Sequence, residues 1–498
     1  MRTLFSTFIF FITTSFLPAK DYNILDYGAA PDGKTMNTTA IQSAIDMAAK
    51  KGKGRVVIPE GIFLTGSIIL KSGVELHLQK NAVLQGSTNP DDYSKLNRWK
   101  AVIMADGQSN ISITGIGQID GQGRRLALNI DSLYYIGQLD SAQYDFAHMR
   151  PKEPMRPQLI EFVNCKNIQV RNVTLSSAAC WVQTYQSCEN VLLDSVHVIS
   201  DAYWNNDGID IVDCHHVRIT NCDINVADDG ICLKSVSADQ FCDSIYVANC
   251  VIRSSASAIK FGTVSHGGFR NVTIEKIKIH DTFRSAVAIE CVDGGTLENV
   301  LVNGVEALNT GNAIFIRLGD RSKTRDAGIL RNVALKNMKV EISFERPDYA
   351  YEIRGPELPF FHNIFPSSIT GIPGYPVQNV SLENIEIIYP GRGNNGLANM
   401  PLSRLDKVPE QVAEYPEFSM FGELPAWGFY VRHVEGLMMK NIKLSIDAPD
   451  YRPSLVFDNV REITMQTLKI TGDSKTTGIV LHQCKNLNID SDVPVLRK

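Results

Sequence analysis

Hydrophobic and polar residues alternate with a period of two in short segments that recur along most of the chain. Each segment opens with a polar residue followed by Val or Ile, and the openings between residues 167 and 299 lie 23 to 28 residues apart. The openings are at Asn110, Asn167, Asn190, His216, Ser244, Asn271, Asn299, Asn332, Asn379 and Asn441. Alternating segments rich in Val, Ile and Thr are typical of β-strands. Their regular repetition predicts an all-β, single-domain solenoid in which each coil packs on the next.

One segment has a helical pattern instead. Between Thr39 and Lys50, apolar residues recur at helical spacing, and the pattern ends before Gly52. An amphipathic helix ahead of the first coil is expected to cap the otherwise exposed end of the solenoid. Two stretches, 124–157 and 340–430, break the strand rhythm. Long excursions of this kind are expected to form loops that wall a binding groove.

The N-terminus predicts export. A single cation, Arg2, precedes an apolar run from Leu4 to Leu17, and small and polar residues follow it. This order is typical of a secretory signal peptide, here residues 1–19, which leaves a domain of residues 20–498. The run is shorter than a bilayer-spanning helix, so we expect no membrane span and a periplasmic or extracellular location.

Composition limits the partners and cofactors. The chain has 498 residues, a net charge of −5 and 21% charged residues. Nucleic-acid-binding proteins usually carry a basic excess, so no nucleic-acid partner is expected. The ten cysteines contain no C-x-x-C pair, which disfavours a zinc ribbon, and the sequence predicts neither a metal ion nor a cofactor. Cys165, Cys188 and Cys214 hold equivalent positions before successive strands, a pattern that favours stacked free thiols over disulfides.

Three carboxylates occupy one column of the repeat. Asp207 precedes one strand, and Asp228 with Asp229 precede the equivalent strand one coil later. Adjacent strands lie about 4.8 Å apart, so these side chains are expected to cluster. Close carboxyls raise each other's proton affinity, and one acid beside one base is what glycoside hydrolysis requires. The competing interpretation is ordinary Asp-Gly turn chemistry, which suits Asp32-Gly33 and Asp120-Gly121 elsewhere in the chain.

Further polar side chains follow the same strands. Because side chains alternate along a strand, five of them are expected to point outward onto one strip beside the carboxylates. They are Asp210, Lys234, Lys260, Glu290 and Arg317.

The sequence around these aspartates resembles the glycoside hydrolase family 28 polygalacturonases. The matching segments are Asn205–Asp210, Asp228–Ser235, Asp26–Ala29 and Gly115–Gly121, the first two following the family's Asn-Thr-Asp-Gly-Ile-Asp and Asp-Asp-x-Ile-x-Ile-Lys-Ser signatures. The resemblance implies a right-handed parallel β-helix and inverting hydrolysis of pectic, galacturonic-acid-type bonds. It implies that Asp228 is the general acid and that Asp207 and Asp229 activate water. Substrate-binding roles are expected for Asn205, Asp210 and Lys234.

The chain departs from the family at two substrate-binding motifs. The family's Gly-His-Gly aligns with Ala256–Ala258, which places Ser257 where the histidine would stand, and its Arg-Ile-Lys aligns with Ala288–Glu290. His266, nine residues beyond Ser257, is a candidate replacement for the histidine. The carboxylate cluster is therefore retained, while the sugar-binding residues around it differ.

The departure leaves a uronate carboxylate without its usual cationic partners. An acidic groove that lacks cations would repel such a substrate. Lys260 and Arg317 flank the altered motif, so we expect them to bind the carboxylate, with Glu290 orienting them or bonding a sugar hydroxyl. The alternative is a structural ion-pair ladder, Lys260–Glu290–Arg317, that only joins neighbouring coils.

Three functions remain open from the sequence. The leading one is an exported inverting glycosidase, exo-acting because the two excursions are long enough to close one end of a groove. A polysaccharide lyase on the same kind of solenoid would instead use carboxylates to hold calcium and a cationic base to remove a proton. The third is a carbohydrate-binding solenoid without catalysis. A pectic polysaccharide or oligosaccharide is the expected partner, and the oligomeric state is left open.

Overall fold

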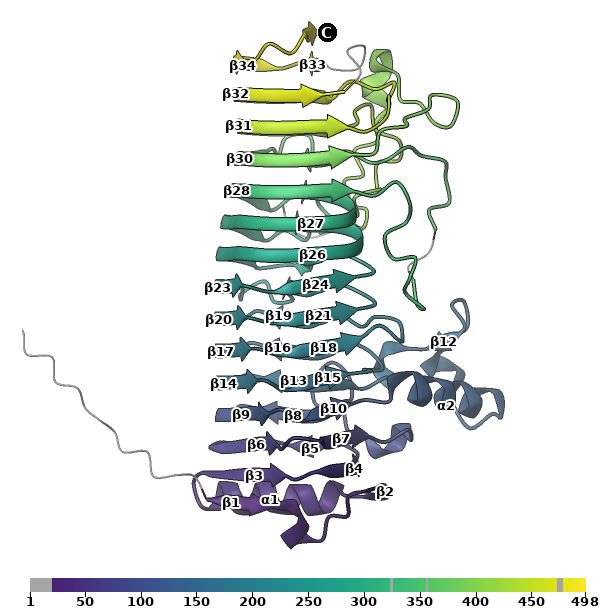
Figure 1. The fold of residues 1–498 in the computed structure, drawn as a ribbon, viewed down its shortest axis with the longest axis vertical. Coiled ribbons are helices and arrows are strands. Elements are labelled where there is room, and N and C mark those ends of the chain that lie inside the picture. The colour runs from purple at the N-terminus through teal and green to yellow at the C-terminus, as the bar shows by residue number, and fades with distance from the viewer. Residues whose placement is uncertain (1–19, 323–325, 355–356, 473–477) are drawn as a thin grey trace, which may run out of the picture.

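The chain forms one long β-solenoid whose coils stack along a single axis (Figure 1). A computed structural model describes residues 20–322, 326–354, 357–472 and 478–498. The predicted signal peptide, residues 1–19, lies outside the described residues. The strands pair in parallel from coil to coil, which confirms the predicted parallel β-helix.

Three parallel sheets form the sides of the solenoid. The first contains β1 (Asp21–Asn23), β3 (Gly54–Ile58), β6 (Val74–Leu78), β9 (Ser109–Gly115), β14 (Lys166–Arg171), β17 (Glu189–Asp194), β20 (His215–Thr220), β23 (Cys242–Ala248) and β34 (Lys485–Asp490). The second contains β2 (Asp32–Met36), β4 (Gly61–Thr65), β7 (Ala82–Gly86), β10 (Gln118–Asp120), β15 (Thr174–Ser176), β18 (His197–Ser200), β21 (Asp223–Val226) and β24 (Val251–Ser254).

The third sheet carries the five charged residues that were expected on one strip, Asp210, Lys234, Lys260, Glu290 and Arg317. It contains β5 (Ile68–Ile69), β8 (Ala101–Asp106), β13 (Gln158–Val163), β16 (Gln183–Gln186), β19 (Ile209–Val212), β22 (Ile231–Ser235), β25 (Ile259–Ser265), β29 (Ser367–Thr370), β33 (Ile479–His482) and β35 (Val495–Arg497). Longer strands continue around the corners from one sheet to the next. These are β26 (Gly268–Cys291), β27 (Thr296–Leu318), β28 (Ile329–Ile342), β30 (Val377–Tyr389), β31 (Phe429–Ile446) and β32 (Leu455–Thr471).

The polar residue that opens each repeat forms a bend in the chain. All ten of these residues, from Asn110 to Asn441, have φ angles between 53° and 59°. Asn tolerates this left-handed conformation better than most residues, which explains why it dominates the position. The side chains also bond between coils: the Asn190 amide donates to Asn167 at 3.1 Å, and that of Asn167 donates to Asn110 at 3.0 Å.

Apolar and thiol side chains fill the interior. Val217, Ile245 and Val272 occupy one register position on successive coils and are at most 2% exposed. Burying each such side chain contributes roughly 1.5–3 kcal/mol, repeated at every coil. All ten cysteines lie within the described residues and are free thiols, as the sequence pattern predicts.

A helix covers the first coil. It is α1 (Thr38–Lys50), which begins one residue before the predicted segment. Its apolar stripe is fully buried against the first strands and the short 3-10 helix η1 (Ile24–Tyr27). The stripe consists of Ile41, Ala44, Ile45 and Ala48. The helix therefore closes the N-terminal end of the core (Figure 1). None of the helices in the described residues is both long and apolar enough to cross a membrane.

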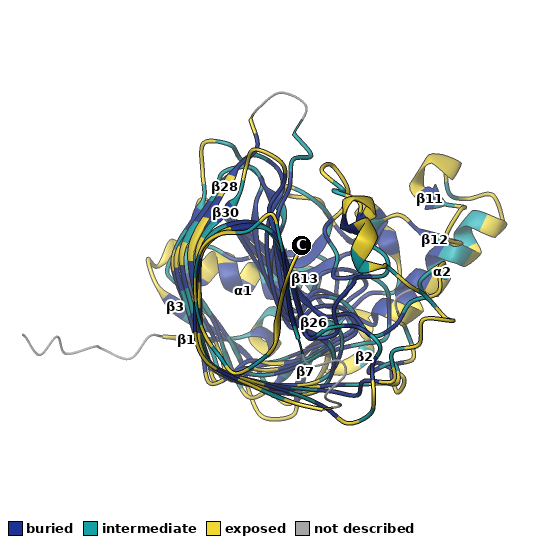
Figure 2. Ribbon diagram, turned by 90° about the horizontal axis from the view of Figure 1, so that it is seen from above, coloured by how far each residue is buried: buried dark blue, intermediate teal, exposed yellow. Residues whose placement is uncertain are grey.

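The excursions stand out on one side of the solenoid (Figures 1 and 2). The first contains α2 (Gly123–Tyr135), η3 (Ser141–Gln143), a small hairpin of β11 (Tyr144–Asp145) and β12 (Arg150–Pro151), and η4 (Glu153–Met155). The predicted second excursion, 340–430, is two loops, 343–366 and 390–428, because β29 and β30 continue the solenoid between them. The short 3-10 helix η5 (Leu402–Lys407) lies in the later loop, and η2 (Pro90–Asp92) in a smaller turn.

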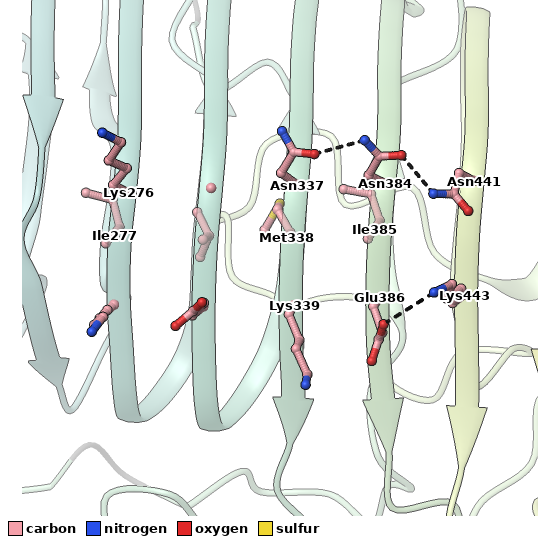
Figure 3. A pocket seen from close by; sticks show the side chains of 14 residues that line it. Lys276, Ile277, Asn337, Met338, Lys339, Asn384, Ile385, Glu386, Asn441 and Lys443 are labelled. Carbon is pink, nitrogen blue, oxygen red and sulfur yellow. Dashed lines mark hydrogen bonds and ion pairs between the residues drawn. The ribbon is translucent and has the colours of Figure 1, made fainter.

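A hollow of about 510 Å³ lies at the bend between the first and second sheets (Figure 3). Its walls are regular: Asn384 donates to Asn337 at 2.9 Å, and Asn441 donates to Asn384 at 2.8 Å. Glu386 and Lys443 pair at 3.9 Å across two coils. These side chains repeat from coil to coil and bond to their neighbours, so we assign no chemistry to this hollow.

Candidate active site

The three aspartates meet at the corner between the second and third sheets. Asp207 precedes β19, and Asp228 and Asp229 precede β22 on the next coil. Carboxylate oxygens of Asp207 and Asp229 lie within 4.8 Å of each other. The glycines that follow Asp207 and Asp229 allow this stacking, since a Cβ on Gly208 would lie 2.5 Å from the Gly230 carbonyl oxygen. These two Asp-Gly pairs are therefore close-packed corners rather than ordinary turns.

Asp228 and Asp229 differ in environment. Asp228 is half-buried and accepts a hydrogen bond from the Asp229 backbone N–H at 2.9 Å, whereas Asp229 is only 4% exposed. Burial and then the charge of Asp229 raise the pKa of Asp228 above its ordinary value. Burial opposes ionisation of Asp229 too, but the charges of Lys260, Lys234 and Arg284 prevail and lower its pKa. The surroundings thus favour the protonated form of Asp228 and the ionised form of Asp229.

Lys234 pairs with two buried carboxyl groups, those of Asp207 and Asp210. Its ammonium lies 3.1 Å from Asp207 and 2.9 Å from Asp210, and it sits 4.4 Å from the ring centroid of Trp181. Burial raises the pKa of Asp207 well above its ordinary value and that of Asp210 to about 6, against the opposing charge of Lys234. Asp207, Asp229 and Cys232 would suit a metal ion by distance, but the Lys234 ammonium lies 3.0 Å from the Cys232 thiol and supplies positive charge there.

Lys260 stabilises the ionised form of Asp229. Its ammonium lies 3.1 Å from the Asp229 carboxylate and donates to the Tyr415 hydroxyl at 3.0 Å. The backbone N–H of Ser257 donates to the same carboxylate at 3.1 Å. Ser257 thus reaches the cluster through its backbone, at the position where the family carries histidine.

The side chain of Asn205 is held by Arg156, a residue that the repeat pattern does not single out. The Arg156 guanidinium donates to its side-chain oxygen at 2.9 Å and to the backbone carbonyls of Ala179 and Trp204 at 3.0 and 2.8 Å. Arg156 is fully buried. It therefore fixes the segment that leads into Asp207, yet it belongs to the first excursion, where no repeat register applies.

Arg317 is committed to the fold and is not available to a substrate. Its guanidinium donates to the carbonyl oxygens of Gly371, Glu410 and Gln411 at 3.0, 2.8 and 2.9 Å, and the residue is 1% exposed. Burial lowers its pKa to about 10. The expectation that it binds a carboxylate is therefore corrected: Arg317 fastens the 390–428 loop to the third sheet.

The expected ladder of Lys260, Glu290 and Arg317 does not form among the described side chains. Lys260 is in register with Ala288, while Glu290 is in register with Arg317, so Lys260 stands one column away. Lys260 pairs with Asp229 instead. Lys260 lies two residues before the position equivalent to Glu290, so alternation places both on one face of the sheet but in different columns.

Glu290 is a carboxyl buried at the end of β26. It is 2% exposed, and its Oε2 has no hydrogen-bond partner among the described residues. Burial raises the pKa of Glu290 to about 8, opposed by the charge of Lys260 and reinforced by that of Asp229. It therefore holds a proton at neutral pH and does not serve as the anionic partner of the cations.

Replacing Glu290 by glutamine is expected to stabilise the protein at neutral pH. The folded protein keeps the Glu290 proton up to about pH 8, whereas the unfolded chain loses it near pH 4.5. Between these values the folded state binds more protons, so this group makes stability fall as pH rises. Glu290→Gln removes this pH-dependent loss, which amounts to about 3 kcal/mol in the free energy of unfolding at pH 7.

Thermal melts across pH 4.5 to 8 measure this effect. The variant and the parent should melt alike at pH 4.5 and diverge as pH rises, with the variant more stable at pH 7. Glu306→Gln, an exposed carboxyl on the neighbouring strand β27, is the matched control and should follow the parent at every pH. A variant that is less stable than its parent at pH 7 would show that Glu290 is ionised and paired.

His266 does not join the aspartates. It follows β25 at the opposite edge of the third sheet, where its backbone N–H donates to the Ser235 carbonyl at 2.8 Å. Its ring Nδ1 lies 3.3 Å from the Asp293 carbonyl oxygen. The expectation that it replaces the family histidine is therefore corrected.

Arg284 is a cation of the site that the sequence analysis missed. It pairs with Glu417 at 3.0 Å, and its charge acts on both Asp228 and Asp229. Its backbone N–H donates to the carbonyl of Ala256, so it occupies the Asp228 position of the repeat two coils further on. Extending the aligned column by one residue would have found Arg284, but nothing in the pattern indicates Glu417 or Tyr415, which come from the 390–428 loop.

The fold and the carboxylate cluster together define a parallel β-helix protein with a glycosidase-type pair of carboxyl groups. The model of the Glycosyl hydrolases family 28 matches residues 49–341. The chain belongs to this family.

Sequence relatives agree with this assignment, and a solved structure agrees with the fold. The chain is 24% identical over 342 residues to a probable polygalacturonase of Vitis vinifera, a match that covers 64% of this chain and 62% of that protein. It is 27% identical over 354 residues to an exo-poly-alpha-D-galacturonosidase of Dickeya chrysanthemi, covering 61% and 58%. The fold resembles an exopolygalacturonase from Thermotoga maritima with a TM-score of 0.59 and 23% identity, covering 75% and 88%. The chain thus spans less than two thirds of the length of these two sequence relatives.

Proposed function

We propose that the protein is an inverting glycoside hydrolase that cleaves uronic-acid-containing pectic chains. The observation that supports this most is the contrast between Asp228, whose pKa is raised, and Asp229, whose pKa is lowered, at one corner of the solenoid. Two carboxyl groups whose pKa values are shifted in opposite directions can serve as the acid and the base that inverting hydrolysis needs. The related proteins named for polygalacturonase activity support the pectic substrate.

In the proposed reaction Asp228 protonates the glycosidic oxygen as the bond between that oxygen and the anomeric carbon breaks. Asp229, with Asp207 beside it, takes a proton from a water molecule, whose oxygen attacks the anomeric carbon from the opposite face. Lys260 favours the ionised form of Asp229, and Lys234 holds Asp207 and Asp210 in place through contacts of 3.1 and 2.9 Å. The anomeric configuration is therefore inverted.

Contacts between the excursions support exo action. Arg124 of α2 pairs with Glu352 of the 343–366 loop, and the Arg253 guanidinium of β24 stacks on Tyr351 of that loop at 3.9 Å. The 390–428 loop adds Tyr415 and Glu417 beside the aspartates. Loops joined in this way would close one end of a groove and leave a pocket for a chain terminus. The predicted signal peptide supports export to where such polymers occur.

We expect digestion to release a monomer from the first moments and to leave polymer viscosity almost unchanged. A pocket that admits only a chain end cannot cut in the interior of the polymer, so chain length falls slowly. Viscometry in parallel with chromatography of early products measures both quantities. Rapid viscosity loss with early products of mixed length would contradict the closed pocket.

A further inference from the structure

An aromatic hollow of about 300 Å³ opens between β26 and the two loops of the second excursion. Four rings shape it, and we call it the aromatic pocket: Phe283, Phe344, Phe365 and Phe418. The rings of Phe365 and Phe418 meet edge to face at a centroid distance of 5.2 Å, and those of Phe283 and Phe418 at 6.2 Å. The aromatic side chains that line the pocket thus come from β26 and from the 343–366 and 390–428 loops.

The aromatic pocket adjoins the candidate active site. Phe283 and Phe418 are the chain neighbours of Arg284 and Glu417, which pair at 3.0 Å, and the charge of Arg284 acts on Asp228 and Asp229. Arg284 occupies the position of Asp228 two coils further along the axis. With coils about 4.8 Å apart, the pocket begins about 10 Å from the proposed acid. A chain bound at the aspartates and running along the solenoid would reach it.

The charges around the aromatic pocket disfavour an acidic ligand. Glu345 and Glu357 belong to its lining. Arg346 is the only arginine among the described residues that line it, and it pairs with buried Asp348 through Nε–Oδ1 and Nη2–Oδ2 contacts of 2.6 and 3.2 Å. Guanidinium groups stack on two of the rings: the Cζ of Arg346 lies 4.1 Å from the Phe283 centroid, and that of Arg392, outside the lining, lies 4.5 Å from the Phe344 centroid. Within the lining, a uronate carboxylate would meet two glutamates and one arginine that already pairs with Asp348.

We propose that the aromatic pocket binds an uncharged pyranose of the substrate, about two coils from the bond that is cleaved. This inference rests on the proposed function for the position of that bond. The apolar C–H face of a pyranose packs on aromatic rings, while its hydroxyls bond to polar groups at the rim such as Ser343 and His362. The substrate is therefore a pectic chain in which a neutral sugar stands near the uronic acid residue under attack.

The experiment measures binding rather than turnover, with the full chain carrying Asp228→Asn so that no probe is consumed. The probes are methyl glycosides of galactose, rhamnose, xylose and arabinose, with methyl galacturonide as the charged comparison, each titrated by saturation-transfer NMR. Phe344→Ala removes a ring of the pocket, and because Phe344 is 47% exposed, the fold should survive. Phe361→Ala is the matched control, since Phe361 lies on the same loop, is 80% exposed and is not part of the pocket lining.

At least one neutral glycoside should bind, with a Kd that rises about 10-fold in Phe344→Ala and does not change in Phe361→Ala. Methyl galacturonide should give no signal that depends on Phe344. The proposal is overturned if no neutral glycoside shows Phe344-dependent binding, or if the galacturonide depends on Phe344 to the same extent. Hydrolysis assays on the unchanged protein report separately on the proposed function. A protein that hydrolyses no pectic chain but keeps this binding would refute the hydrolase and leave the pocket standing.

Discussion

Replacing Asp228 by asparagine should abolish hydrolysis while leaving the fold and substrate binding nearly intact. The amide has the shape of the acid but cannot deliver a proton to the leaving oxygen, and general acid–base groups contribute about 10²–10⁴-fold to rate. Asp228 is half-buried and accepts one backbone hydrogen bond, from Asp229, which an amide oxygen also accepts. Initial rates on an unactivated pectic oligosaccharide measure the loss, and thermal melts report on the fold.

Asp120→Asn is the matched control for this variant. Asp120 also precedes a glycine at a corner of the solenoid, and its side chain accepts from the Gln122 backbone N–H at 3.0 Å, which asparagine can reproduce. Activity should therefore be unchanged in Asp120→Asn. If Asp228→Asn kept a third or more of the parent rate, Asp228 would not be the general acid.

Replacing Lys260 by methionine should lower both activity and stability. The ammonium is buried within 3.1 Å of Asp229, and removing one member of a buried ion pair typically costs about 3–5 kcal/mol because the other charge stays unpaired. Without this ammonium the pKa of Asp229 should rise, and less of the base would be ionised. We expect turnover to fall by about 100-fold, a size typical of losing one acid–base partner.

A double-variant cycle isolates the pair. Lys260→Met combined with Asp229→Asn should recover most of the lost stability, since no unpaired charge remains, but none of the activity. Chemical denaturation and initial rates on the four proteins measure the two effects. If the single Lys260→Met variant melted like its parent and kept the parent rate, the contact between Lys260 and Asp229 would have no role in the reaction.

The sequence predicted the solenoid and the cluster of Asp207, Asp228 and Asp229 because both follow from periodicity. A repeat fixes which residues stack, and stacking at known strand spacing brings those side chains together. Lys260 and Glu290 were expected on one strip because both face outward, but they stand two residues apart in the repeat and so do not stack.

The rest of the site comes from segments that have no period. Arg156, Tyr415 and Glu417 lie on the excursions, whose path over the third sheet depends on tertiary packing rather than on local pattern. The 390–428 loop also explains why the prediction that Arg317 binds a substrate carboxylate was wrong. The repeat predicted the position of Arg317 on its strand. It did not predict that the guanidinium donates hydrogen bonds to the carbonyl oxygens of Glu410 and Gln411.

The central claim is that Asp228 and Asp229 act from opposite sides of the anomeric carbon, and proton NMR of the first product tests it most directly. Rapid acquisition after enzyme is added to a defined pectic oligosaccharide shows the anomer before mutarotation mixes it. We predict an inverted anomer, and no unsaturated sugar that absorbs ultraviolet light. A product of retained configuration, or an unsaturated product, would contradict the account.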